Sequence, residues 1–166
     1  MDKKGYCKIN TLIITHYDKD HIGGASDIIS KYNVEQVIES SFTSNNQLYK
    51  DYHNAISNCG ATLKKLDENY EFSSNGSRFL VNVPKNSSYK TDKSNNSSLV
   101  ISMNCGNKKL LFCGDALETR MSEIINEHPG RYDLVKLPHH GTCLENYTEI
   151  INELQPSYAV ITSSNK

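Results

Sequence analysis

Along this chain, segments with the two-residue alternation or apolar runs of strands are interspersed with segments in which apolar residues recur at the spacing of helices. Apolar or alternating runs predict strands, and apolar residues at three- and four-residue spacing predict helices. The expected strands cover residues 8–15, 34–38, 61–66, 69–72, 77–83, 98–104, 108–113, 134–137 and 158–162. The expected helices cover residues 25–32, 48–59, 117–127 and 143–154. This order predicts an α/β chain with two mostly antiparallel or mixed sheets and helices outside them.

One polar segment interrupts the pattern. Residues 85–98 are rich in Asn, Ser and Lys, and most of this segment is predicted to be a solvated loop. Its end differs, because Asn95-Asn96-Ser97-Ser98 runs directly into the apolar residues of the next strand.

The densest group of chemically reactive residues follows the first strand. Within Leu12–Gly24, an apolar run is followed by four potential metal ligands, His16, Asp18, Asp20 and His21. His16 and Asp18, two residues apart at the end of a strand, can converge on one ion, while Asp20 and His21 can turn toward a second. Two metals about 3.5–4 Å apart can hold the attacking and leaving oxygens of a hydrolytic reaction.

Two later segments add residues of the same kind. Asp115 follows Gly114 at the end of the strand 108–113. The pair His139-His140 follows Pro138 at the end of the strand 134–137. Cys113 could face the same side as Asp115, although a buried structural thiol is the simpler interpretation.

These motifs, in this order, resemble the metallo-β-lactamase superfamily, whose signature is His-x-His-x-Asp-His. Asp18 stands where most members have the second histidine. The variant His-x-Asp-x-Asp-His-x-Gly-Gly, with Asn-x-x-Ser-Leu-Val at 95–100 and Pro-His-His-Gly at 138–141, is most similar to the hydrolase domain of ComEC-type competence proteins and its stand-alone relatives. The resemblance implies a four-layer αββα sandwich, apparently lacking the usual N-terminal strands.

The same resemblance implies a ligand set for two Zn²⁺ or Mn²⁺ ions. The first site would use His16 and Asp18, the second would use Asp20, His21 and His140, and Asp115 would bridge them. Asp20, Asp115 and His139 would be catalytic, with His139 orienting a ligand, contacting substrate or donating a proton. The segment 95–99 lacks the histidine that other members place there, so the first site loses a usual ligand.

Length and composition bear on the domain organisation and on the cellular compartment. A length of 166 residues suggests a single domain, 1–166, clipped or incomplete at both ends relative to the family pattern. A partner segment or an oligomer would then cover the missing strands. Five scattered cysteines, Cys7 among them, predict free thiols in a reducing cytoplasm, and neither a signal peptide nor a membrane span is visible.

The substrate is less well defined by the sequence. A net charge of −1 argues against a broad basic surface for nucleic acid, but it permits a phosphodiester, including DNA, that is held by metals. A small-molecule hydrolase acting on a thioester or lactam is a second possibility, because one fold hosts many chemistries. A non-catalytic, incomplete domain is a third.

Overall fold

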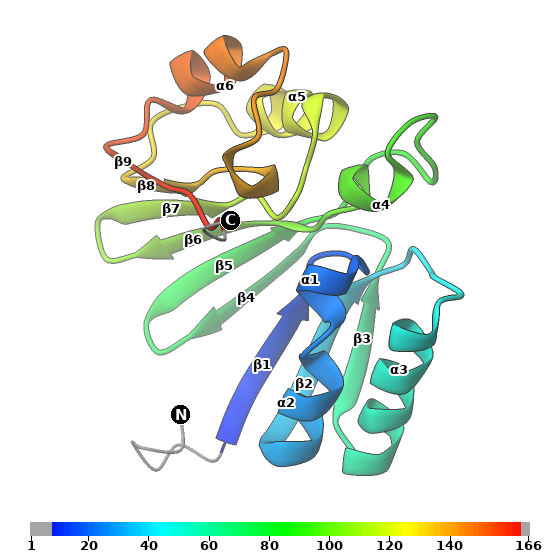
Figure 1. Cartoon of the computed structure of the whole chain (residues 1–166). Helices are drawn as coiled ribbons and strands as arrows, with labels where there is room; N and C mark the ends of the chain where they lie inside the picture. The colour runs from blue at the N-terminus through cyan, green and yellow to red at the C-terminus, as the bar shows by residue number, and fades with distance from the viewer. Residues whose placement is uncertain (1–7, 164–166) are drawn as a thin grey trace. The chain divides into compact units, whose positions relative to one another are not determined.

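The structure, a computed structural model, describes residues 8–163, and Cys7 lies outside this range. The chain forms two compact units, one ending at Asp67 and one beginning at Glu68, each with its own sheet (Figure 1). That residues 1–166 make a single domain stays a prediction. Within residues 8–163, every helix is too short or too polar to cross a bilayer.

The first unit contains a three-stranded sheet in the order β1-β2-β3. Its elements are β1 (Lys8–Ile14), α1 (Lys19–Ile22), α2 (Ala25–Lys31), β2 (Asn33–Ser40), α3 (Gln47–Cys59) and β3 (Thr62–Leu66). Both strand pairs are parallel, so the expectation of a mostly antiparallel or mixed arrangement is wrong for this sheet. The reason is that each connection is a helical crossover, which returns the chain to the same end of the sheet.

Helices α2 and α3 pack against the sheet of the first unit (Figure 1). Their apolar stripes close one core, built around Ile29, Val37, Tyr52 and Ile56. Helix α3 ends at Cys59, as the predicted range 48–59 has it, and Gly60 follows in the left-handed region at φ 73°. This core holds β1 and β2 in register, so their carboxyl ends lie next to each other.

The second unit contains a six-stranded mixed sheet in the order β4-β5-β6-β7-β8-β9. Its elements are β4 (Tyr70–Ser74), β5 (Ser77–Asn82), α4 (Lys93–Asn96), β6 (Val100–Cys105), β7 (Lys108–Phe112), α5 (Glu118–Glu127), β8 (Leu134–Lys136), the 3₁₀ turn η2 (His139–Gly141), α6 (Tyr147–Leu154) and β9 (Tyr158–Val160). Strands β4 to β7 are antiparallel, and β8 and β9 continue in parallel.

Helices α5 and α6 cover one face of this sheet (Figure 1) and form a second core with Leu111, Val135, Met121 and Ile150. Two expectations change here. Helix α6 begins at Tyr147 and not at residue 143. The polar segment 85–98 contains a short helix, α4, and its last residues, Asn96 to Ser98, are buried.

Candidate metal centre

The four ligand-type residues of the first unit lie where β1 ends, at the carboxyl edge of a parallel sheet. Such edges are where open α/β sheets bind their ligands. Asp20 and His21 lie inside α1, a short helix that is absent from the predicted elements. Gly23 ends α1, and an added Cβ there would lie 2.4 Å from the Lys19 carbonyl oxygen. A glycine is therefore required for the tight turn that follows the motif.

The two imidazoles of this motif stand side by side, with ring centroids 4.1 Å apart. The Nδ1 atoms of His16 and His21 lie 3.1 and 3.5 Å from the Thr15 hydroxyl oxygen. Their Nε2 atoms face carboxylates, with His16 3.7 Å from Asp18 Oδ2 and His21 3.7 Å from Asp20 Oδ2. The structure thus brings together all four predicted residues of this unit as two imidazole–carboxylate pairs.

A buried carboxylate behind this loop was missed by sequence reasoning. Glu39, at the end of β2, has a fully buried side chain that lies 3.4 Å from His53 Nε2 and 3.3 Å from Lys65 Nζ. Tyr17, between two of the ligand-type residues, donates its hydroxyl to the Ser40 carbonyl at 3.0 Å. Burial, and then the negative charge of Glu39, raise the pKa of Tyr17. The neutral Tyr17 hydroxyl therefore fastens the motif to β2.

His53 lies off the apolar stripe of the predicted helix 48–59, a position typical of a surface residue. The structure places it in the middle of α3 and against Glu39. The sequence feature that could have revealed this pairing is Glu39, because a glutamate directly after the apolar residues of a buried strand requires partners.

In the second unit, Asp115 occupies the turn between β7 and α5. Gly114 adopts φ 57°, and the Asp115 side chain is buried. Lys136 Nζ lies 3.7 Å from Asp115 Oδ1 and donates to the Gly114 carbonyl at 3.0 Å. His140 Nε2 lies 3.2 Å from Asp115 Oδ2. The structure therefore brings together Asp115 and His140, which the sequence had placed on two different strand ends.

The backbone at the histidine pair is unusual. His139, His140 and Gly141 all have positive φ values, of 43°, 56° and 79°. Positive φ is costly for residues other than glycine, and it is concentrated at functional sites. The His139 amide donates to the Gly114 carbonyl at 3.2 Å, which ties this turn to the Asp115 turn. Among the described residues, the buried Nδ1 of His139 has no hydrogen-bond partner.

The orientation of the His140 ring makes the second unit suitable for binding a cation. A carbonyl oxygen only accepts, so the 2.6 Å contact between His140 Nδ1 and the Thr162 carbonyl requires a proton on Nδ1. In the neutral ring, Nε2 then carries a lone pair directed at the Asp115 carboxylate. A lone pair and a carboxylate oxygen at 3.2 Å repel unless a proton or metal ion lies between them. A ligating histidine with its other nitrogen bonded to a carbonyl is the usual arrangement in metal sites.

Two other candidates are not available as ligands. Cys113 is a fully buried core residue, and burial raises the pKa of its thiol to about 12. Asn96 lies in the segment where other superfamily members place a third histidine. Its carboxamide oxygen instead accepts from the backbone amides of Leu117 and Arg120. The remaining donors are imidazole nitrogens and carboxylate oxygens, a set that suits Zn²⁺ and Mn²⁺.

Comparison with known proteins agrees with this chemistry. Residues 5–45, which include the first motif, match the family model described as the metallo-beta-lactamase superfamily. The described fold is similar to that of the metallo-beta-lactamase fold protein YhfI from Bacillus subtilis, with a TM-score of 0.53 at 8% identity over 95% of this chain and 76% of that one. The sequence match over residues 5–45 and the likeness of fold both relate this chain to the metallo-beta-lactamase superfamily.

Two curated proteins are similar to this chain over nearly all of its length. The chain is 30% identical to ComE operon protein 3 of Bacillus subtilis (strain 168), over 96% of this chain and 20% of that protein. It is 28% identical to Recombination protein 2 of Haemophilus influenzae, over 93% of this chain and 18% of that protein. The chain thus spans about a fifth of the length of these relatives. The predicted ComEC-type resemblance is confirmed.

Proposed function

We propose that this chain is a metal-dependent phosphodiesterase, and that its substrate is a phosphodiester of the DNA type. The observation that carries the proposal is the His140–Asp115 pair, in which a fixed Nε2 lone pair faces a buried carboxylate at 3.2 Å. The two imidazole–carboxylate pairs of the first unit support it. The likeness to ComE operon protein 3 and to Recombination protein 2 favours a nucleic-acid substrate over a lactam.

The proposed ligand set is the one that the superfamily resemblance implies. His16 and Asp18 would hold one divalent ion, Asp20, His21 and His140 would hold a second, and Asp115 would serve both. Bound Zn²⁺ or Mn²⁺ would polarise the phosphoryl oxygen and lower the pKa of a water molecule. A set without thiolates is hard enough to accept Mn²⁺ as well as Zn²⁺.

The residues of the chain have distinct roles in this proposal. The Thr162 carbonyl would orient His140 and, in the neutral ring, leave the lone pair on Nε2. Asp20, exposed beside His21, accepts a proton from the attacking water. His139, the neighbour of His140 in the 3₁₀ turn, would donate a proton to the leaving oxygen. The chain's net charge of −1 fits a substrate held by metals and not by a basic surface.

The test begins with metal content after reconstitution with Zn²⁺ and Mn²⁺. It continues with a panel of bis(p-nitrophenyl) phosphate, plasmid DNA, a chromogenic lactam and a thioester. We expect phosphodiester cleavage stimulated by Mn²⁺, and a loss of roughly 10³-fold or more in rate for Asp115→Ala, since metal positioning is worth several kcal/mol. Asp133→Ala removes a half-buried carboxylate of the same unit, which pairs with Lys108 at 2.7 Å, and is the control.

Two results would overturn the proposal. Turnover of the lactam or thioester without phosphodiester cleavage would reassign the substrate class. Failure to bind either metal would leave a non-catalytic domain.

A further inference from the structure

The segment 95–98 carries side chains that are not needed as ligands and yet are buried. Asn96, Ser97 and Ser98 are each at most 3% exposed. Burial of polar groups is costly unless each finds a partner. Ser97 donates to the nearby Ser94 carbonyl at 2.6 Å. The partners of Asn96 and Ser98 lie on the turn that bears Asp115 and on the first turn of α5, so these two residues act on the backbone around Asp115.

Asn96 supplies the cap that α5 lacks. The N-cap residue of α5 is Leu117, whose side chain cannot accept a hydrogen bond. The carboxamide oxygen of Asn96 accepts from the amides of Leu117 and Arg120, at 3.2 and 3.4 Å. Arg120 is the third residue of the helix, the position whose amide an N-cap side chain normally satisfies. Asn96 thus performs from α4 the role that the local sequence leaves open.

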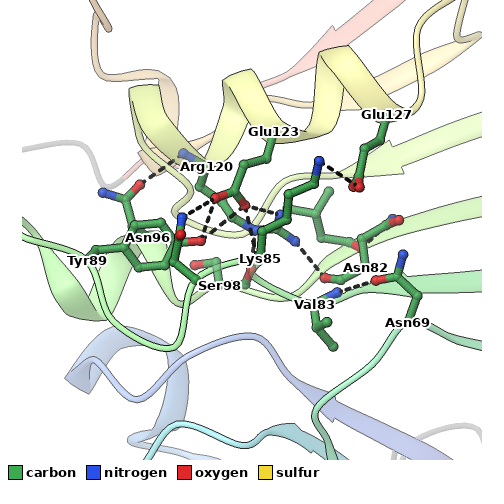
Figure 2. A network of polar contacts seen from close by, with 12 residues as sticks. Asn69, Asn82, Val83, Lys85, Tyr89, Asn96, Ser98, Arg120, Glu123 and Glu127 are labelled. Atoms are coloured by element: carbon green, nitrogen blue, oxygen red, sulfur yellow. Dashed lines mark hydrogen bonds and ion pairs between the residues drawn. The ribbon is translucent and has the colours of Figure 1, made fainter.

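Ser98 holds Asp115 itself. Its hydroxyl oxygen accepts from the Asp115 amide at 3.3 Å, and its carbonyl accepts from Arg120 Nε at 3.1 Å. Arg120 is fully buried, and its other nitrogens donate to the Asn82 carbonyl and to the Glu123 carboxylate, both at 2.8 Å. The contacts form a closed frame: the segment 96–98 holds the turn before α5, and a side chain of α5 holds the segment in return (Figure 2).

The frame extends to the preceding polar loop. Glu123 accepts from the Tyr89 hydroxyl at 2.9 Å, from Asn86 Nδ2 at 3.0 Å and from the Lys85 amide at 3.3 Å. Burial, and then Glu123, raise the pKa of Tyr89 to about 12, so the Tyr89 hydroxyl stays a donor at neutral pH. The loop 85–91 is therefore anchored to the same arginine–glutamate pair that holds Ser98 (Figure 2).

We propose that Ser98 is a positioning residue for Asp115, held in place by Asn96 and Arg120, and that segment 96–98 tunes the metal centre through the Asp115 backbone and not as a ligand. This inference rests on the proposed function, in which Asp115 bridges the metals. A bridging carboxylate must be held within a fraction of an ångström, and loss of a group that orients a ligand typically lowers metal affinity by about 10–100-fold.

The test compares Ser98→Ala with Asn69→Ala. Each substitution removes one side-chain acceptor from one backbone amide of the second unit. Ser98 accepts from Asp115. Asn69 instead accepts from Val83 at 2.9 Å, directly after β5 (Figure 2). Two readouts are measured on the full chain: the amide hydrogen-exchange rate at Asp115, and the affinity for Mn²⁺ and Zn²⁺ by calorimetric titration. Ser98→Thr, which keeps the hydroxyl, is the conservative variant.

We expect Ser98→Ala to accelerate exchange at Asp115 and to weaken metal binding by at least about 10-fold. We expect Asn69→Ala to change neither the exchange rate at Asp115 nor the metal affinity. Ser98→Thr should keep both at the wild-type values. Equal metal affinities in the two alanine variants, or unchanged exchange at Asp115 in Ser98→Ala, would overturn the inference. If the wild-type chain bound no metal, the proposed function would fail, and the exchange rates alone would decide whether Ser98 fixes Asp115.

Discussion

His140 donates its Nδ1 proton to the carbonyl oxygen of Thr162 across 2.6 Å. Thr162 follows β9, so a ligand-type residue carried at the end of β8 is oriented by the neighbouring parallel strand. The bond leaves Nε2 as the only nitrogen of the neutral ring that can bind a metal. It also distinguishes His140 from His139, whose main-chain amide is the part tied to the Asp115 turn.

The first prediction follows from this difference. We expect His140→Ala to lower the affinity for Zn²⁺ by more than about 100-fold, because loss of an orienting partner alone costs about 10–100-fold and this change removes the ligand itself. His139→Ala, at the adjacent position, should bind Zn²⁺ as the wild type does while losing turnover. Calorimetric titration of both apo variants measures this. Similar affinities for the two variants would contradict the assignment of His140 as the ligand.

The second prediction concerns unequal metal sites. The site of His16 and Asp18 lacks a third histidine, and the Asn96 carboxamide that stands in that segment is committed to α5. We therefore expect titration of the apo protein to show two phases, with the site of Asp20, His21 and His140 filling first. Asp18→Ala should remove only the weaker phase. A single phase of two equal sites would refute the proposed division of ligands.

Much of this fold could be predicted from hydrophobic periodicity. All nine predicted strands are present within a few residues, as are the four predicted helices. These elements bury continuous apolar stripes, and the spacing of apolar residues in a single sequence is enough to predict such stripes. Clustering of ligand-type residues within each unit was also predictable, because Asp115 and His140 end strands that prove to flank one another in parallel, β7 and β8.

The features that escaped prediction depend on tertiary contacts. Helix α4 is only four residues long and is polar. Its last residue, Asn96, is fixed by the amides of Leu117 and Arg120, 21 and 24 residues further along the chain. Parallel pairing in the first sheet follows from the crossovers and not from any strand's own pattern. Glu39 was not among the predicted site residues, because its partners His53 and Lys65 come from α3 and β3.

The third prediction is a loss of stability in mild acid. Burial lowers the pKa of His53 and of His128 below the ordinary value of 6.5, against the opposing effects of Glu39 and Glu127. Lys65 and Lys109 lower these pKa values further. The unfolded chain therefore binds protons more readily than the folded one. The free energy of unfolding should be constant above pH 6.5 and should fall as the pH drops below it.

Urea denaturation of the metal-free protein at several pH values between about 5 and 8 measures this effect. The double variant His53→Gln/His128→Gln should show a smaller decrease over the same range. An equal decrease in the double variant and the wild type would assign the acid sensitivity to other groups.

The last prediction concerns the buried carboxylate behind the first motif. Glu39→Gln keeps the shape of the side chain but removes the charge that faces His53 and Lys65. Both partners retain some access to water, with side chains 24% and 43% exposed, so they are not left as isolated buried charges. We therefore expect a loss of about 1–3 kcal/mol in the free energy of unfolding, the usual cost of an unsatisfied buried polar group, and not the larger cost of a fully buried broken pair.

Glu35→Gln is the matched control, because Glu35 lies on the same strand and pairs with Lys8 at 2.8 Å, but both side chains are about half exposed. Exposed pairs contribute little, so this variant should unfold at the same urea concentration as the wild type. Because Tyr17 is packed by the Glu39 network and lies between His16 and Asp18, Glu39→Gln should also weaken metal binding, which Glu35→Gln should leave unchanged. If both variants had the same urea midpoint and the same metal affinity, Glu39 would have no role in holding the motif to β2.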